Sequence, residues 1–156
     1  MKYLSLILMV SVFSATTNAA TPESDAPPIP DKGVYVKDTE IAGLYKAIEP
    51  FTQKALKAYP AAKKRFEQGL PDGQYFFAVT RIRDHSGVEE QIFVSVSEIK
   101  DQTIHGYMYN KPKNVRGYRF LQAYRFPENK LIDWMITKPN GEQEGNFVGK
   151  YLEGLN

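Results

Sequence analysis

Between Asn110 and Phe126 the chain carries a run of cations and aromatic rings with no acidic residue among them. Positive charges attract phosphates and carboxylates over a distance, and aromatic faces stack on bases or sugars. The segment therefore predicts a surface that binds an anionic partner. A strand with its aromatic rings in a core and its arginines in water would give the same pattern, and both interpretations stay open. The side chains that would form the binding surface are Lys111, Lys113, Arg116, Tyr118, Arg119, Tyr124 and Arg125.

A second distinctive segment is Asp133-Trp134-Met135, which holds the only tryptophan of the chain. In a binding site, Trp134 would stack on a ligand and Asp133 would accept hydrogen bonds from it. The alternative is structural: Trp134 anchors the core, and the Asp133 carboxylate holds a turn by accepting a backbone N–H. We favour the structural role, because a large aromatic side chain contributes most when it is buried.

Few residues are suited to metal or acid–base chemistry. The chain has two histidines and no cysteine. His85 lies near Glu89 and Glu90 in an expected hairpin, which offers too few ligands for zinc or iron, and His105 stands alone in an expected strand. We therefore expect no metal and no cofactor, and we assign no catalytic residue. The sequence also lacks the serine-hydrolase elbow, the zinc-protease helix motif and the glycine-rich loops that bind phosphates or dinucleotides.

The composition limits the function classes further. The 156 residues carry 20 basic and 18 acidic side chains, and 42% of the residues are hydrophobic. This length is typical of one domain, and without cysteine the chain has no disulfide, thiolate nucleophile or lipidated cysteine. A dedicated nucleic-acid-binding protein usually has a much larger basic excess, so we expect no nucleic-acid partner.

The first 19 residues have the pattern of a secretory signal peptide. Lys2 provides a positive charge, an apolar run extends over residues 3–13, and small residues precede a cleavage site after Ala19. The run is too short to span a bilayer core about 30 Å thick. We expect export to the periplasm or to the outside of the cell, as a soluble protein with no transmembrane span after cleavage. Residues 20–38, rich in proline and small residues, are expected to form an extended linker.

The remaining residues, 39–156, are expected to form a single α+β domain. Apolar residues recur every three or four positions over residues 41–70, which predicts amphipathic helices kinked or broken at Pro50 and Pro60. Beyond this stretch the period changes to two. Strands are predicted at residues 75–82, 90–99, 103–109, 119–126, 131–137 and 146–151. Successive strands without helices between them pair antiparallel, so the helices should pack on a meandering sheet of five or six strands.

The order of motifs from Ala55 onward resembles that of a bacterial family, the domain of unknown function 2314, also called YegJ-like proteins. Its features are an alanine-rich helix, a strand with Glu-His-x-Trp, an Asn-x-Pro segment, the sequence Ile-x-Asp-Trp-Met and a glycine-rich final strand. The strongest match is Leu131-Ile-Asp-Trp-Met135, and the resemblance extends over most of the expected domain. The positions of this chain that correspond to the family motifs are Glu90, Asn110, Pro112, Asp133, Trp134, Met135, Gly145, Phe147 and Lys150.

The chain departs from the family pattern in two places. Gln91 and Phe93 replace the histidine and the tryptophan of Glu-His-x-Trp, and Phe147 and Lys150 replace the tyrosine and the arginine of the last strand. If relatives use that histidine in chemistry, this chain lacks it. The resemblance implies a fold and a setting in the bacterial envelope, but it implies no reaction.

From these observations we expect an exported, non-catalytic binding or accessory protein of the bacterial cell envelope, whose partner is an unknown envelope protein or an anionic polymer. Two alternatives remain open. One is a hydrolase of an envelope polymer that uses carboxylates such as Glu89, Glu90 or Asp133. The other is an immunity-type protein that blocks a secreted toxin through one tight protein contact.

Overall fold

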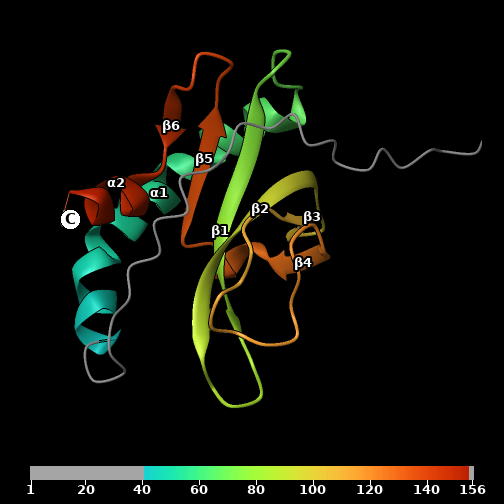
Figure 1. Cartoon of the computed structure of the whole chain (residues 1–156). Coiled ribbons are helices and arrows are strands. Elements are labelled where there is room, and N and C mark those ends of the chain that lie inside the picture. Colours follow the sequence, from blue (N-terminus) through green and yellow to red (C-terminus); the bar gives the residue numbers. More distant parts are fainter. Residues whose placement is uncertain (1–40, 155–156) are drawn as a thin grey trace, which may run out of the picture.

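The structure is a computed structural model, and it describes residues 41–154. Within this range a six-stranded antiparallel sheet packs against a long helix, which confirms the expected α+β class (Figure 1). The signal peptide and the linker predicted for residues 1–38 lie outside the described residues. Among the helices of residues 41–154, none combines the length and the hydropathy of a membrane-spanning segment.

The elements follow one another through mostly short connections. Helix α1 (Ile41–Glu67) precedes the strands β1 (Tyr75–Arg83), β2 (Glu89–Lys100), β3 (Thr103–Met108) and β4 (Ala123–Pro127). The short helix η2 (Glu128–Lys130) leads to β5 (Asp133–Thr137), β6 (Gln143–Gly145) and helix α2 (Phe147–Glu153). The strand order in the sheet is β4-β3-β2-β1-β5-β6. Strands β1 to β4 thus form the expected meander, and the chain then crosses back to place β5 on the other side of β1.

Helix α1 continues through both prolines, so it is not divided at Pro50 and Pro60 into the separate helices that we expected. An internal proline costs about 3 kcal/mol, because it removes one backbone donor and crowds the preceding turn. The helix continues because Ala55, Tyr59 and Ala62, on both sides of Pro60, are buried against the sheet. Packing along one face of the helix thus outweighs the local cost.

The main core lies between α1 and one face of the sheet; Figure 1 shows α1 behind the strands and α2 beside them. Alternate residues of each strand point to this face, as the period of two predicts. Each large apolar side chain buried here contributes roughly 1.5–3 kcal/mol relative to exposure. The buried members are Ala55, Tyr59, Ala62, Phe76, Ala78, Ile82, Ile92, Val94, Val96, Ile104, Met108, Val115, Phe126, Leu131, Trp134 and Ile136.

The opposite face of the sheet carries a smaller apolar cluster. Phe77 and Met135 are fully buried and lie directly opposite each other in the β1–β5 register. Tyr109 and Phe93 pack against them. Phe93, which corresponds to the tryptophan of the Glu-His-x-Trp pattern, is therefore a packing residue in this chain.

One of our strand predictions, near the C-terminal end of the chain, was wrong. Residues 146–151, predicted as a strand, lie mostly in helix α2, and the sixth strand is instead Gln143–Gly145. Val148 and Leu152 follow helical spacing and pack with Ile48 of α1. The prediction failed because six residues are too few to distinguish a period of two from a period of 3.6.

Candidate binding surface

Residues 109–122 form a long loop between β3 and β4, and a carboxylate holds its backbone. The Glu90 side chain accepts hydrogen bonds from the N–H groups of Lys113, Asn114 and Val115, at 2.9 to 3.3 Å. Such charge-assisted bonds are roughly twice as strong as neutral ones, so they fix the course of the loop. Glu90, a position of the family motif, therefore has a structural partner for both of its oxygens.

A second carboxylate holds the next turn of the loop. Asp84, between β1 and β2, accepts the N–H of Arg116 at 3.3 Å with one oxygen. Its other oxygen accepts the N–H groups of Ser86 and Val88 and the Ser86 hydroxyl. These bonds lower the pKa of Asp84, and the Ser86 hydroxyl has the largest effect. The β1–β2 hairpin and the loop are thus fastened together through one ionised side chain.

The two ends of the loop are fixed as well. Asn110 is buried, and its Oδ1 accepts the N–H of Phe93 at 2.7 Å. Pro112 follows in the same motif and is half-buried. Near the other end, Tyr118 packs edge-to-face on Tyr124, with ring centroids 6.2 Å apart. The Asn-x-Pro motif therefore contributes to positioning the loop relative to β2.

The loop leaves its cationic side chains in water. Lys111, Arg116, Arg119 and Arg125 are exposed, and none of them pairs with a carboxylate of the described residues. Lys113 is exposed too. The two tyrosines of the predicted surface pack against the main core, so they support the surface and do not offer free stacking faces. The seven predicted residues thus come from one loop and the strand that follows it, with the cations outermost.

Two apolar residues at the end of the loop are exposed although they are not among the seven predicted binding residues. Phe120 and Leu121 are 50% and 37% exposed. Leu121 has a φ of 58°, which bulky side chains rarely adopt, and its N–H donates to the Met108 carbonyl at 2.8 Å. This turn replaces the first part of the strand predicted for residues 119–126, so that β4 begins only at Ala123.

Replacing Glu90 with alanine is expected to release the loop while the sheet remains folded. Three backbone N–H groups lose their acceptor, and the free energy of unfolding should fall by about 1–3 kcal/mol. The amides of residues 113–115 should exchange hydrogen about tenfold faster or more, as measured by NMR. Glu98→Ala is the matched control, because Glu98 is exposed on the same strand. Equal exchange in both variants would contradict the anchoring role of Glu90.

Asp133 and Trp134 are both buried, and both make hydrogen bonds within the fold. The Asp133 carboxylate accepts the N–H of Val148 at 2.7 Å, at the start of α2, and the N–H of Trp134 at 2.8 Å. Burial raises the pKa of Asp133 to about 6, and the backbone bonds, led by that of Val148, act in the opposite direction. The Trp134 Nε1–H donates to the Ala55 carbonyl at 2.9 Å. In the described structure this segment joins β5 to both helices.

The remaining motif positions surround Trp134. The ring of Phe147 packs edge-to-face on it, with centroids 6.0 Å apart. Gly145 has a φ of 77°, and a Cβ there would collide with the Trp134 carbonyl oxygen. Lys150 donates from Nζ to the carbonyls of Gly145 and Gln143, at 2.8 and 3.1 Å. These residues hold β6 and α2 against β5.

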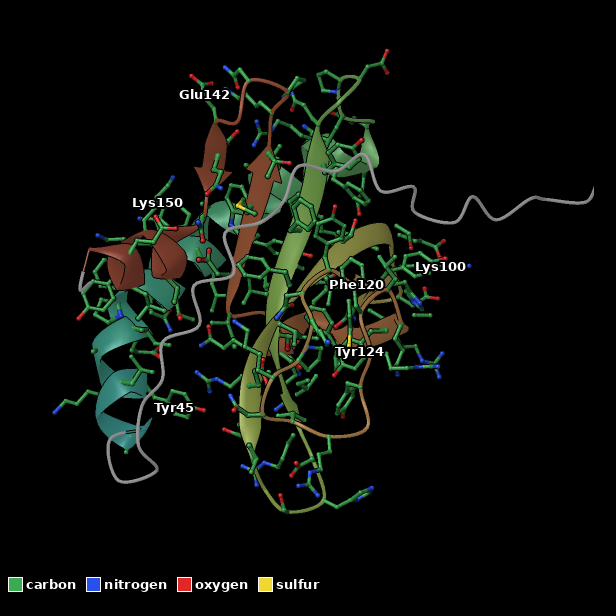
Figure 2. All side chains as sticks on the ribbon, viewed as in Figure 1. Tyr45, Lys100, Phe120, Tyr124, Glu142 and Lys150 are labelled. Atoms are coloured by element: carbon green, nitrogen blue, oxygen red, sulfur yellow. The ribbon has the colours of Figure 1, made fainter. Side chains whose placement is uncertain are left out.

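A charged cluster lies where the N-terminal part of α1 meets β1 and β2. Glu89 accepts the Tyr45 hydroxyl at 2.7 Å, and Arg83 donates to it from Nε and Nη2 at 3.0 and 2.6 Å. Figure 2 shows the Tyr45 side chain pointing from α1 toward these strands. The hydrogen bond from Tyr45, followed by that from Arg83, lowers the pKa of Glu89. Arg81 lies over the Tyr45 ring, with its guanidinium carbon 3.6 Å from the ring centroid.

The three carboxylates considered for a hydrolase are not gathered in one site. Glu89 and Glu90 are consecutive in β2 and point to opposite faces of the sheet, while Asp133 is the buried first residue of β5. His85 is exposed in the hairpin turn, and His105 lies on β3. Residues 41–154 contain no group of three or more histidine, aspartate or glutamate side chains placed to hold a metal ion.

The chain is similar to one known family over nearly all of the elements described above. Residues 45–154 match the sequence pattern of a family described as uncharacterised proteins conserved in bacteria, DUF2314. No curated protein and no solved structure shows significant similarity to the chain. The matched range contains every motif position from Glu90 to Lys150 and more than half of the 156 residues. The chain therefore belongs to the DUF2314 family.

Proposed function

We propose that the protein is a non-catalytic binding protein of the bacterial cell envelope, which contacts an anionic protein or polymer through the loop of residues 109–122 and strand β4. The observation that supports this proposal most is the set of four exposed cations that form no ion pair with residues 41–154, on a backbone that two carboxylates hold in place. A loop that is already ordered loses less conformational entropy on binding. Unpaired cations attract an anionic surface over about 8–10 Å at moderate salt.

Two further observations favour this proposal over its alternatives. The carboxylates considered for catalysis are engaged in structural bonds: Glu89 with Tyr45 and Arg83, and Glu90 with the loop backbone. The signal-peptide pattern of residues 1–19 supports the envelope setting.

Charge reversal on the loop is the direct test. Arg116, Arg119 and Arg125 are exposed, so their replacement by glutamate should change the free energy of unfolding by no more than about 0.5 kcal/mol per site. The tagged protein without residues 1–19 is incubated with washed envelope extract, and the bound partner is quantified at rising salt. We expect the triple variant to retain less than about a tenth of the partner, because three cationic contacts become repulsive.

A second triple variant separates the loop from the net charge. Lys46, Lys57 and Lys64 are exposed on α1, and their replacement by glutamate changes the net charge by the same amount. This variant should bind as the wild type does. Equal losses in both triple variants would show that only net charge matters. Salt-independent capture of one stoichiometric protein, unaffected by either variant, would favour the immunity-type alternative.

A further inference from the structure

A cleft of about 510 Å³ lies between β1, β4 and the segment that leads from η2 into β5. Its lining combines cationic side chains with an apolar wall. The cations are Arg81, Arg125 and Lys130, and the apolar residues are Phe126, Leu131 and Ile132. Within the part of the chain that the structure describes, Glu89 is the one carboxylate of the lining. This volume is within the usual range of small-molecule sites, about 300–1,000 Å³.

Arg81 is held in place by stacking on an aromatic ring, and no residue of the described range accepts a hydrogen bond from its side chain. Its guanidinium carbon lies 3.6 Å from the centroid of the Tyr45 ring, and this stacking fixes the plane of the group. Its Nε is buried and has no hydrogen-bond partner among residues 41–154. Buried donors in folded proteins nearly always have an acceptor. The guanidinium group is therefore oriented by the Tyr45 ring, and its terminal nitrogens make no hydrogen bond to residues 41–154 that would compete with a ligand.

Glu89 does not supply the missing acceptor. One of its oxygens accepts the Tyr45 hydroxyl at 2.7 Å, and the other accepts two N–H groups of Arg83. The ion pair with Arg83, at 2.6 Å, offsets the charge of Glu89. Arg81 and Lys130 thus remain as cations in the cleft, and neither forms a close ion pair with a carboxylate in the described range. The charge of Arg81 acts on Glu89 only at longer range, where it helps to lower the pKa of Glu89 after the hydrogen bonds from Tyr45 and Arg83.

We propose that this cleft binds a small organic monocarboxylate with an apolar body. The planar guanidinium of Arg81 matches a carboxylate through two parallel hydrogen bonds, and Lys130 adds a second positive charge. The wall that includes Leu131 and Ile132 covers the apolar body. The apolar residues of the lining favour a carboxylate that carries an apolar body over inorganic phosphate. This site lies outside the loop of residues 109–122, but it shares Tyr124 and Arg125 of β4 with the proposed partner surface.

Three probes test the ligand class. N-acetyl-leucine carries the carboxylate of a peptide C-terminus, octanoate carries that of an acyl chain, and N-acetyl-leucinamide has no charge. Each is titrated into the protein, and backbone amide shifts are followed by NMR. We expect shifts at Arg81 and residues 129–132 with the two carboxylates, and at least tenfold weaker binding of the amide. Tighter binding of one carboxylate identifies the peptide or the acyl source, and no shift with either would overturn the proposal.

Substitution of Arg81 tests the assigned side chain. Arg81→Gln removes the charge, and at least a tenfold loss of carboxylate affinity is expected. Arg81→Lys keeps the charge without the planar fork, and it should bind with intermediate affinity even if the glutamine variant proves unstable. Arg116→Gln, the same change on the loop, should leave carboxylate affinity unchanged. Wild-type affinity in both Arg81 variants would refute the site.

The experiments distinguish a failure of the cleft proposal from a failure of the partner-binding proposal. Arg81→Gln is expected to capture the envelope partner as the wild type does, whereas the loop triple variant loses that partner. Arg125 belongs both to the cleft and to the partner-binding surface. The control for carboxylate binding is therefore Arg116→Gln and not the triple variant, which also changes Arg125. Loss of partner capture in Arg81→Gln would overturn the separation of the cleft from the loop surface.

Discussion

Alanine in place of Trp134 is expected to lower the free energy of unfolding by about 3–5 kcal/mol. The side chain is 2% exposed, and its ring packs between Phe76 and Phe147. Its Nε1–H also donates to the Ala55 carbonyl of α1 at 2.9 Å. The variant leaves a cavity and removes the hydrogen bond that joins β5 to α1. Urea denaturation followed by circular dichroism measures the loss, since the variant lacks the only tryptophan of the chain.

Two controls separate the contributions of Trp134. Trp134→Phe keeps an aromatic ring and loses the indole donor, so a smaller loss than that of the alanine variant is expected. Phe120→Ala removes an aromatic ring that is 50% exposed, and it should change stability by no more than about 0.5–1 kcal/mol. If Trp134→Ala costs less than about 1 kcal/mol, the anchoring role of Trp134 is wrong.

Asp133→Ala is expected to cost about 2–4 kcal/mol, because the buried N–H groups of Val148 and Trp134 lose their acceptor. Helix α2 has only seven residues, so it depends on this bond and on its packing against α1. Chemical denaturation measures the total loss. Hydrogen exchange at Val148 shows whether α2 detaches first. Unchanged protection of Val148 would contradict the role of Asp133 as its acceptor.

The charge of Asp133 makes a pH-dependent contribution to stability. Burial raises its pKa from 3.8 to about 6, so the folded state holds this proton more tightly than the unfolded state does. The resulting stabilisation is complete below about pH 4 and is lost as the pH rises through about 6, with a span of about 3 kcal/mol. The stability difference between the wild type and Asp133→Asn should therefore decrease from pH 4 to pH 7.

A pH-independent difference for Asp133→Asn would show that the carboxylate has the same charge in both states. The comparison with this variant is needed because other carboxylates make the stability rise, and not fall, with increasing pH. The pKa values of Glu89 and Glu144 are lowered by hydrogen bonds from Tyr45 and Arg65, respectively. Their contributions are present above the ordinary carboxylate range and are lost in acid. They are the same in both proteins, so they cancel in the difference.

The spacing of apolar residues over short stretches of the sequence was enough to predict the α+β class and most of the strands. The alternation of residues 90–99 predicted β2, and the run of residues 131–137 predicted β5, because side-chain direction in a strand depends only on position along the chain. Helix α2 was not predicted from such spacing, because its start is held by the Asp133 carboxylate from β5. The continuity of α1 through Pro60 was not predicted either, because burial against the sheet outweighs the local effect of the proline.

The sequence by itself also determined which residues are candidates for binding, by grouping the cations of residues 111–125 without an acid between them. Only the tertiary structure decided what each charged residue does. It shows that the Glu90 carboxylate accepts hydrogen bonds from the loop backbone and that the Asp133 carboxylate accepts one from the start of α2. It also shows that Arg81 stacks on the Tyr45 ring, in a cleft that no sequence pattern indicated. The reason is that the role of a charged side chain depends on the partners it meets, and these partners come from segments far apart in the chain.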